Sequence, residues 1–262
     1  MMDVYWLEQR ENDVPAADDW LSESESARLS GLRFAKRRSD WRLGRWTAKC
    51  AVAASLKLPD DLQSLKLIEV IAASTGEPEV VLRDNAETAT ISISHSNGIA
   101  ICAVAVGNVA LGCDLEAVDA RSDAFIADYF TKEEQELIAR ANGKKRSLLV
   151  SLLWSAKESA LKALHVGLRA DTRSVDVTKI DALGRWFEVA ASDSENTASS
   201  RDLANDSAAN WTPLEVHCAD GTIFQGWWQH SGNMVRTVVA APPPTPPIEL
   251  RCPNRVATTS LL

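Results

Sequence analysis

The stretch ATISISHSNGIAICAVAVGNVALGCDLE, residues 89–116, is rich in β-forming residues and is interrupted twice by turn dipeptides. Asn97-Gly98 and Gly107-Asn108 are both typical of tight hairpin turns. The stretch therefore predicts three consecutive strands joined by short turns. Its last strand ends in Asp114 and Glu116, which share one face of the sheet because strand residues two apart point to the same side.

Two carboxylates at the end of a buried strand require a physical reason. Asp114 and Glu116 would repel each other unless a positive charge lies between them. A divalent cation is one such partner, and a solvated acidic strand end is the other interpretation of this short segment.

The rest of the chain alternates helices and strands, which predicts a mixed α/β fold. Helices are expected at residues 22–34, 38–56 and 147–165, with a helical stretch at 122–142. No tandem repeat is visible, but both halves contain strands and helices, which permits two similar subdomains. Strands are expected at 4–10, 67–74, 174–180, 184–190, 214–219, 223–230 and 234–241.

Two segments have the composition of loose chain. Residues 191–210 are small and polar without an apolar period, which predicts a loop. The Pro-rich residues 243–262 predict a flexible tail that cannot form a central strand. We therefore expect an N-terminal subdomain over 1–108, a C-terminal subdomain over 109–242 and this tail.

Composition excludes several classes of protein. The 262 residues are 45% hydrophobic and 24% charged, as in an ordinary globular protein. The net charge of −8 argues against a general nucleic-acid binder. No membrane-spanning run or signal peptide is apparent, and the five scattered cysteines form no CxxC pair, so we expect a cytoplasmic protein that binds no membrane.

One segment is strongly basic within this acidic chain. Residues 28–49 hold eight Lys and Arg residues against the single acidic residue Asp40. Such a segment is either a solvated helix face or a phosphate-binding patch, because Arg and Lys bind phosphate oxygens.

The helix predicted over residues 147–165 places apolar side chains on one face and polar ones on the other. Glu158 and Lys162 are four residues apart on the polar face, together with Ser151, Ser155 and His165. They form either a routine surface ion pair or part of a site with the acidic strand. In the second case three carboxylates, Asp114, Glu116 and Glu158, would surround one cation.

In this order, these segments resemble the signature of the surfactin-type 4′-phosphopantetheinyl transferases. LGCDLE matches the Gly-x-Asp-x-Glu strand of that family, and WSAKESALK matches its Trp-Ser-x-Lys-Glu-Ser-x-x-Lys helix. ISISHSNG resembles its Ser-His-Ser segment, and FAKRRSDWRLGRWTAK its basic helix. The similarity covers roughly residues 25–240.

The resemblance implies a fold, a reaction and partners. The fold is a pseudo-dimer of two α/β halves, with the active site in the cleft between them. The reaction moves 4′-phosphopantetheine from coenzyme A to a serine of an apo acyl or peptidyl carrier protein and releases adenosine 3′,5′-bisphosphate. It is that of a holo-acyl-carrier-protein synthase and serves fatty-acid, polyketide or peptide-synthetase pathways. One chain contains both halves, so a monomer is expected.

The resemblance also assigns residues to this reaction. Asp114, Glu116 and Glu158 would hold Mg²⁺, a cation that prefers oxygen ligands. Glu158, or a water on the metal, would accept the serine proton, and Lys162 would neutralise the leaving diphosphate oxygen. The residues expected to bind the coenzyme are Arg38, Arg45, Gly76, Ser94, His95 and Lys157.

Two positions depart from the family pattern, and two other functions stay open. Glu77 stands in the turn STGEP where Lys is usual, and Cys113 replaces a commoner β-branched residue. A metal-dependent nuclease or phosphodiesterase could use the same carboxylates. A non-catalytic module that binds coenzyme A or docks a carrier protein is the third interpretation.

Overall fold

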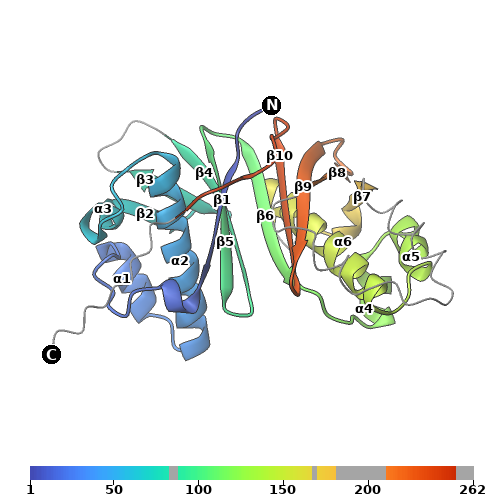
Figure 1. Cartoon of the computed structure of the whole chain (residues 1–262), viewed down its shortest axis with the longest axis horizontal. Coiled ribbons are helices and arrows are strands. Elements are labelled where there is room, and N and C mark those ends of the chain that lie inside the picture. The colour runs from blue at the N-terminus through green and yellow to red at the C-terminus, as the bar shows by residue number, and fades with distance from the viewer. Residues whose placement is uncertain (83–87, 167–169, 181–210, 252–262) are drawn as a thin grey trace, which may run out of the picture.

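The computed structural model describes residues 1–82, 88–166, 170–180 and 211–251. Two sheets lie side by side at the centre, with one long helix on the outer side of each (Figure 1). The predicted mixed α/β class is therefore confirmed. Across the described residues, no helix combines the length and hydropathy needed to cross a membrane.

The first sheet has the strand order β11-β1-β5-β4-β3-β2. Its strands are β1 (Tyr5–Arg10), β2 (Ile68–Ala72), β3 (Pro78–Leu82), β4 (Ala89–Ser96), β5 (Ile99–Val106) and β11 (Ile248–Glu249). The helices of this half are η1 (Glu11–Asp13), α1 (Glu23–Ser30), α2 (Ala35–Ser55) and α3 (Leu62–Leu67).

The second sheet has the strand order β6-β10-β9-β8-β7. Its strands are β6 (Ala110–Ala117), β7 (Val175–Ile180), β8 (Thr212–Cys218), β9 (Ile223–Ser231) and β10 (Met234–Ala241). The helices of this half are α4 (Asp123–Tyr129), α5 (Lys132–Ala139), α6 (Gly143–Ala163) and η3 (Thr172–Ser174).

The two halves repeat one topology. Apart from β11, the first sheet runs 1-5-4-3-2 and the second runs 6-10-9-8-7, which is the same order shifted by five strands. The helices α2 and α6 each contain 21 residues. This internal repeat is not apparent from the sequence because its shared residues are few and far apart.

A buried ion pair recurs at the same place in both halves. Lys49 of α2 lies 2.5 Å from Glu25, and Lys157 of α6 lies 2.8 Å from Glu134. Each glutamate belongs to a capping box at the start of a short helix, α1 or α5. Each also accepts a hydrogen bond from a strand N–H, that of Val70 in β2 or of Val177 in β7. In each half, the lysine–glutamate pair therefore fixes the long helix to a short helix and to a strand.

The predicted strands and turns of the opening stretch are present, and β4 and β5 form a hairpin, but the hairpin predicted at Gly107-Asn108 is wrong because β5 and β6 belong to different sheets. Asn97 and Gly98 have φ angles of 51° and 73°, and Gly107 has 92°, which are left-handed values suited to tight turns. They join β4 to β5 and β5 to β6. The predicted helical stretch 122–142 contains two helices, because Phe130 is extended and Thr131 caps the second one.

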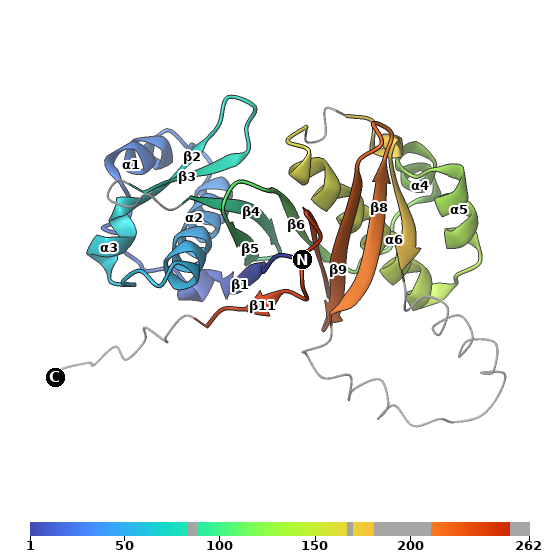
Figure 2. The same ribbon diagram turned by 90° about the horizontal axis from the view of Figure 1, so that it is seen from above.

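The C-terminal segment differs from the loose tail expected for it. Residues 243–251 cross from β10 to the first sheet, where β11 pairs with the edge strand β1 in parallel (Figure 2). The backbone N–H of Ile248 donates to the carbonyl of Val4, just before β1, at 2.9 Å, and that of Leu250 donates to the carbonyl of Trp6 in β1 at 2.8 Å. Proline tolerates such an edge position because only one side of the segment needs N–H donors. The expected loop 191–210, strand 184–190 and residues 252–262 lie outside the described residues.

Candidate functional site

A glycine allows the strand β6 and the helix α6 to approach each other. A Cβ atom on Gly112 would lie 1.8 Å from the backbone oxygen of Ser159, so any other residue would force the two elements apart. The serines of α6 support this packing: Ser155 and Ser159 hydrogen-bond to Thr237 of β10 at 2.9 and 2.7 Å. The polar face of α6 is therefore packed against the sheet rather than solvated.

This packing brings Asp114 of β6 and Lys162 of α6 together. Asp114 is 4% exposed, and its Oδ1 accepts hydrogen bonds from Ser94 Oγ at 2.7 Å and from Lys162 Nζ at 2.8 Å. Lys162 also donates to the Cys113 carbonyl at 3.0 Å. In the part of the chain described, the other Asp114 oxygen, Oδ2, is buried without a hydrogen-bond partner. A buried carboxylate oxygen without a partner is costly, and it is a suitable ligand for a cation.

Glu116 and Glu158 lie within the electrostatic field of Asp114. Burial raises the pKa of Glu116 to about 7, and repulsion from Asp114 adds to this effect. Burial also raises the pKa of Glu158, again with a contribution from Asp114 that Lys162 partly offsets. Asp114 therefore disfavours the charges of Glu116 and Glu158, as expected for groups that share a cation.

Lys162 is bound to the acidic strand rather than forming a surface pair with Glu158. Burial opposes its charge, but the combined effects of Asp114, Cys113 and Glu158 exceed that of burial and raise the pKa of Lys162 above its ordinary value. Its side chain is 28% exposed and lines the larger cavity described below.

The site fits a metal ion in the chemistry of its donor atoms but not in their arrangement. The donor chemistry fits Mg²⁺, since all three candidate side chains are carboxylates and Asp114 Oδ2 lacks a partner. However, no group of three acidic, histidine or cysteine side chains among the described residues is arranged as a metal cluster. The charges are near one another, but the ligands are not assembled around one point.

Two adjoining cavities are lined by three of the six predicted coenzyme ligands and by Lys162. The smaller one, about 190 Å³ in volume, is lined by Arg45, Gly76 and His95. The larger one, about 540 Å³, lies between the halves, and its lining includes Lys162. Both are lined by Gly76, together with Pro78 and Ile93, so the two cavities are neighbours, and the pair is called the cleft below.

Arg45 is held in position for an anionic ligand. Its guanidinium carbon lies 5.1 Å from the centre of the Trp41 ring, and burial lowers the pKa of the side chain. Within the described residues its Nε is buried without a hydrogen-bond partner. His95 is exposed at the end of β4 on the same cavity.

Three predicted coenzyme ligands are engaged elsewhere. Lys157 is fully buried, and its ammonium donates to the Thr172 and Val175 carbonyls beside Glu134, so the prediction that it reaches a phosphate is wrong. Arg38 donates to the Leu29 carbonyl at 2.8 Å and is not among the residues that line the two cavities. Ser94 Oγ donates its hydrogen bond to Asp114 instead of facing a cavity as a lining residue.

Sequence reasoning assigned no role to one residue of the cleft. His165 lines the larger cavity and lies 3.1 Å from Glu77. Its place three residues after Lys162, just beyond the end of α6, is the sequence signal that could have identified it.

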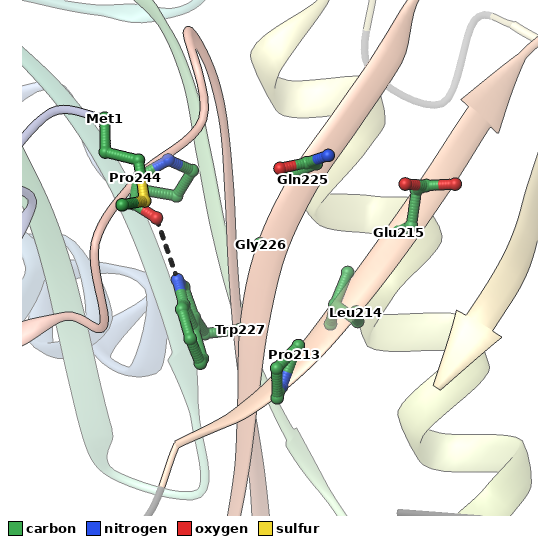
Figure 3. Close-up of a pocket in the computed structure, with 8 residues that line it drawn as sticks. All are labelled: Met1, Pro213, Leu214, Glu215, Gln225, Gly226, Trp227 and Pro244. Atoms are coloured by element: carbon green, nitrogen blue, oxygen red, sulfur yellow. Dashed lines mark hydrogen bonds between the residues drawn. The ribbon is translucent and has the colours of Figure 1, made fainter. Parts of the chain in front are cut away.

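A third cavity, of about 180 Å³, is separate from the cleft. Figure 3 shows it beside β8 and β9, lined by Met1, Pro213, Leu214, Glu215, Gln225, Gly226, Trp227 and Pro244. Trp227 Nε1 donates to the Pro244 carbonyl at 3.2 Å. The cavity shares no lining residue with the cleft, and it holds none of the predicted site residues.

The segment that carries the carboxylates and Lys162 matches a known family. Residues 110–212 match the 4′-phosphopantetheinyl transferase superfamily. This matched segment begins at β6 and contains Asp114, Glu116, Glu158 and Lys162. No curated protein matches the chain.

Several solved structures match part of the chain. A holo-(acyl-carrier-protein) synthase from Bacillus anthracis in complex with CoA (3′,5′-ADP) is 22% identical, with a TM-score of 0.36, over 40% of this chain and 95% of that one. The Helicobacter pylori holo-[acyl-carrier-protein] synthase in complex with coenzyme A is 18% identical, with a TM-score of 0.32, over 40% and 99%. The Chronobacterium ammoniagenes ACPS-CoA complex is 18% identical, with a TM-score of 0.33, over 41% and 99%.

Proposed function

We propose that this chain is a surfactin-type 4′-phosphopantetheinyl transferase that modifies an apo acyl or peptidyl carrier protein. The observation that carries the proposal is the pair of neighbouring cavities, one lined by Arg45 and His95 and the other by Lys162. Beside Lys162 lies the carboxylate group of Asp114, within the segment that matches the superfamily.

Coenzyme A is the ligand that this arrangement suits. Its nucleotide phosphates lie against Arg45 and His95, where a partly buried guanidinium binds anions strongly. Its diphosphate lies near Lys162. Asp114, Glu116 and Glu158 would hold Mg²⁺, which would supply Lewis acidity and a template for the diphosphate.

The protein's own side chains then carry the transfer. The hydroxyl oxygen of the carrier serine attacks the β-phosphorus of coenzyme A, and a new P–O bond forms. Glu158 accepts the serine proton, a role suited to a carboxylate whose pKa burial raises towards neutrality. The bond to adenosine 3′,5′-bisphosphate breaks, and Lys162 neutralises the charge that develops on the departing oxygen.

The test is to incubate the protein with an apo carrier protein, coenzyme A and Mg²⁺, and to follow the carrier by mass spectrometry. We expect addition of one phosphopantetheine group, lost in Asp114→Asn. Asp123→Asn is the matched control, because Asp123 is exposed on α4 and pairs only with Arg146 among the described residues. A carrier of unchanged mass, or an Asp114→Asn variant as active as Asp123→Asn, would overturn the proposal.

A further inference from the structure

Glu77 and His165 meet across the larger cavity of the cleft. Glu77 lies in the turn between β2 and β3 of the first half, and His165 follows the end of α6 in the second half. His165 Nδ1 and Glu77 Oε1 are 3.1 Å apart, and both residues line the cavity that also contains Lys162. The pair therefore links the two halves at the place where the coenzyme diphosphate is proposed to bind.

The backbone of His165 is strained. Its φ angle is +57°, a left-handed value that glycine adopts freely and that histidine adopts at a cost. Glycine is the usual residue just after a helix end for this reason. A histidine that persists there indicates that its side chain has a use, because strained residues concentrate at functional positions.

The use of His165 follows from the charge of Glu77. The hydrogen bond from Thr75 lowers the pKa of Glu77, with further contributions from the backbone and from His165, so this carboxylate is ionised. The ionisable side chains that line the cavity are Glu77, Lys162 and His165. Without His165, the negative charge of Glu77 would counteract the positive charge of Lys162 and would repel an anionic ligand.

We propose that His165 holds the Glu77 carboxylate through this 3.1 Å contact and shields it from the ligand, so that the cleft accepts the anionic coenzyme despite a carboxylate in its wall. His165 is a positioning residue in this scheme, since it acts on the ligand through Glu77. The inference rests on the proposed function, because coenzyme A is the anion concerned. It also accounts for a glutamate at the position where the resembled family usually carries lysine.

The experiment is a double-substitution cycle read by isothermal titration with coenzyme A and with uncharged adenosine. Asn suits position 165 because it tolerates left-handed backbone and carries no charge. We expect His165→Asn to weaken coenzyme A binding by roughly five- to tenfold, since an unpaired carboxylate then faces the diphosphate. Glu77→Gln should bind as tightly as the wild type or more tightly, and the double variant should regain wild-type affinity. Adenosine binding should change by less than about twofold throughout.

The chain offers a closely matched control. His217 Nε2 and Glu215 Oε1 are 2.8 Å apart on β8, and the two histidines are equally exposed at 42%. His217→Asn should leave coenzyme A affinity unchanged. If His165→Asn weakens binding and Glu77→Gln fails to rescue it, or if adenosine is affected equally, the shielding of Glu77 by His165 is wrong while coenzyme binding stands. A wild-type protein that binds no coenzyme A would instead overturn the proposed function and this inference with it.

Discussion

Glu116→Gln is expected to stabilise the metal-free protein, with a gain that grows as pH rises from 4.5 to about 7 and is complete above this range. Burial and Asp114 raise the pKa of Glu116 from 4.5 to about 7. At pH values between 4.5 and about 7, Glu116 is mostly ionised in the unfolded chain and mostly protonated in the folded protein. The free energy of unfolding therefore falls as pH rises through this window, because the folded state binds more protons.

The size of the effect follows from the same difference in pKa. A difference of about 2.5 is equivalent to about 3 kcal/mol, at 1.36 kcal/mol for each pKa unit. The Glu116 side chain is 21% exposed, and water screens part of the repulsion, so we expect a gain on the order of 1–3 kcal/mol at pH 8. At pH 5 the folded wild type keeps the proton on Glu116, and the gain should fall below about 0.5 kcal/mol.

The assay is urea denaturation in the presence of a chelator, at intervals between pH 5 and pH 8.5. Glu133→Gln is the control, because Glu133 is an exposed glutamate on α5 away from the site. Addition of Mg²⁺ at pH 8 should stabilise the wild type more than Glu116→Gln, because a bound cation removes the repulsion. A Glu116→Gln variant that is no more stable than the wild type at pH 8 would refute the claim that the carboxylates repel one another.

Three further changes test the packing and the chemistry of the site. Gly112→Ala should cost about 3 kcal/mol or more in a denaturant melt, because the new methyl group would meet the Ser159 backbone oxygen at 1.8 Å; a cost below about 1 kcal/mol would contradict the close approach of β6 and α6. Lys157→Met and Lys49→Met should each cost about 3–5 kcal/mol, since each leaves a buried glutamate without its cation; a neutral result in either half would contradict the repeated role. Lys162→Ala should slow single-turnover transfer on the order of 10²-fold while coenzyme A binding changes much less, and Lys162→Arg should recover part of the rate; wild-type transfer by the alanine variant would remove Lys162 from the mechanism.

Local patterns were sufficient for the parts of the fold that local interactions determine. The alternation from Ala89 to Glu116 and its two glycine turns predicted β4, β5 and β6, because strand faces and turn geometry depend on neighbouring residues. The order of the acidic and basic motifs also predicted that Asp114 and Lys162 lie in one site.

Contacts between distant segments could not be predicted in the same way. Lys157 is adjacent to Glu158 in sequence, but its partner Glu134 comes from α5, and this contact removes Lys157 from the site. The face of α6 that contains Ser155 and Ser159 is buried only because Gly112 lets β6 approach it. The pairing of β11 with β1 joins residues more than 240 positions apart.

The internal repeat separates residues that serve the fold from residues that serve the proposed chemistry. Trp46-Thr47-Ala48-Lys49 in α2 corresponds to Trp154-Ser155-Ala156-Lys157 in α6, because the two lysines occupy equivalent buried ion pairs. The next position is Cys50 in one half and Glu158 in the other, and the position of Lys162 corresponds to Ala54. What both halves retain is needed to fix a long helix to its sheet, whichever half it lies in. Glu158 and Lys162 occur only in the second half, so they are not needed to fix a long helix to its sheet. They are the carboxylate that we assign to accept the serine proton and the ammonium group that we assign to neutralise the departing oxygen.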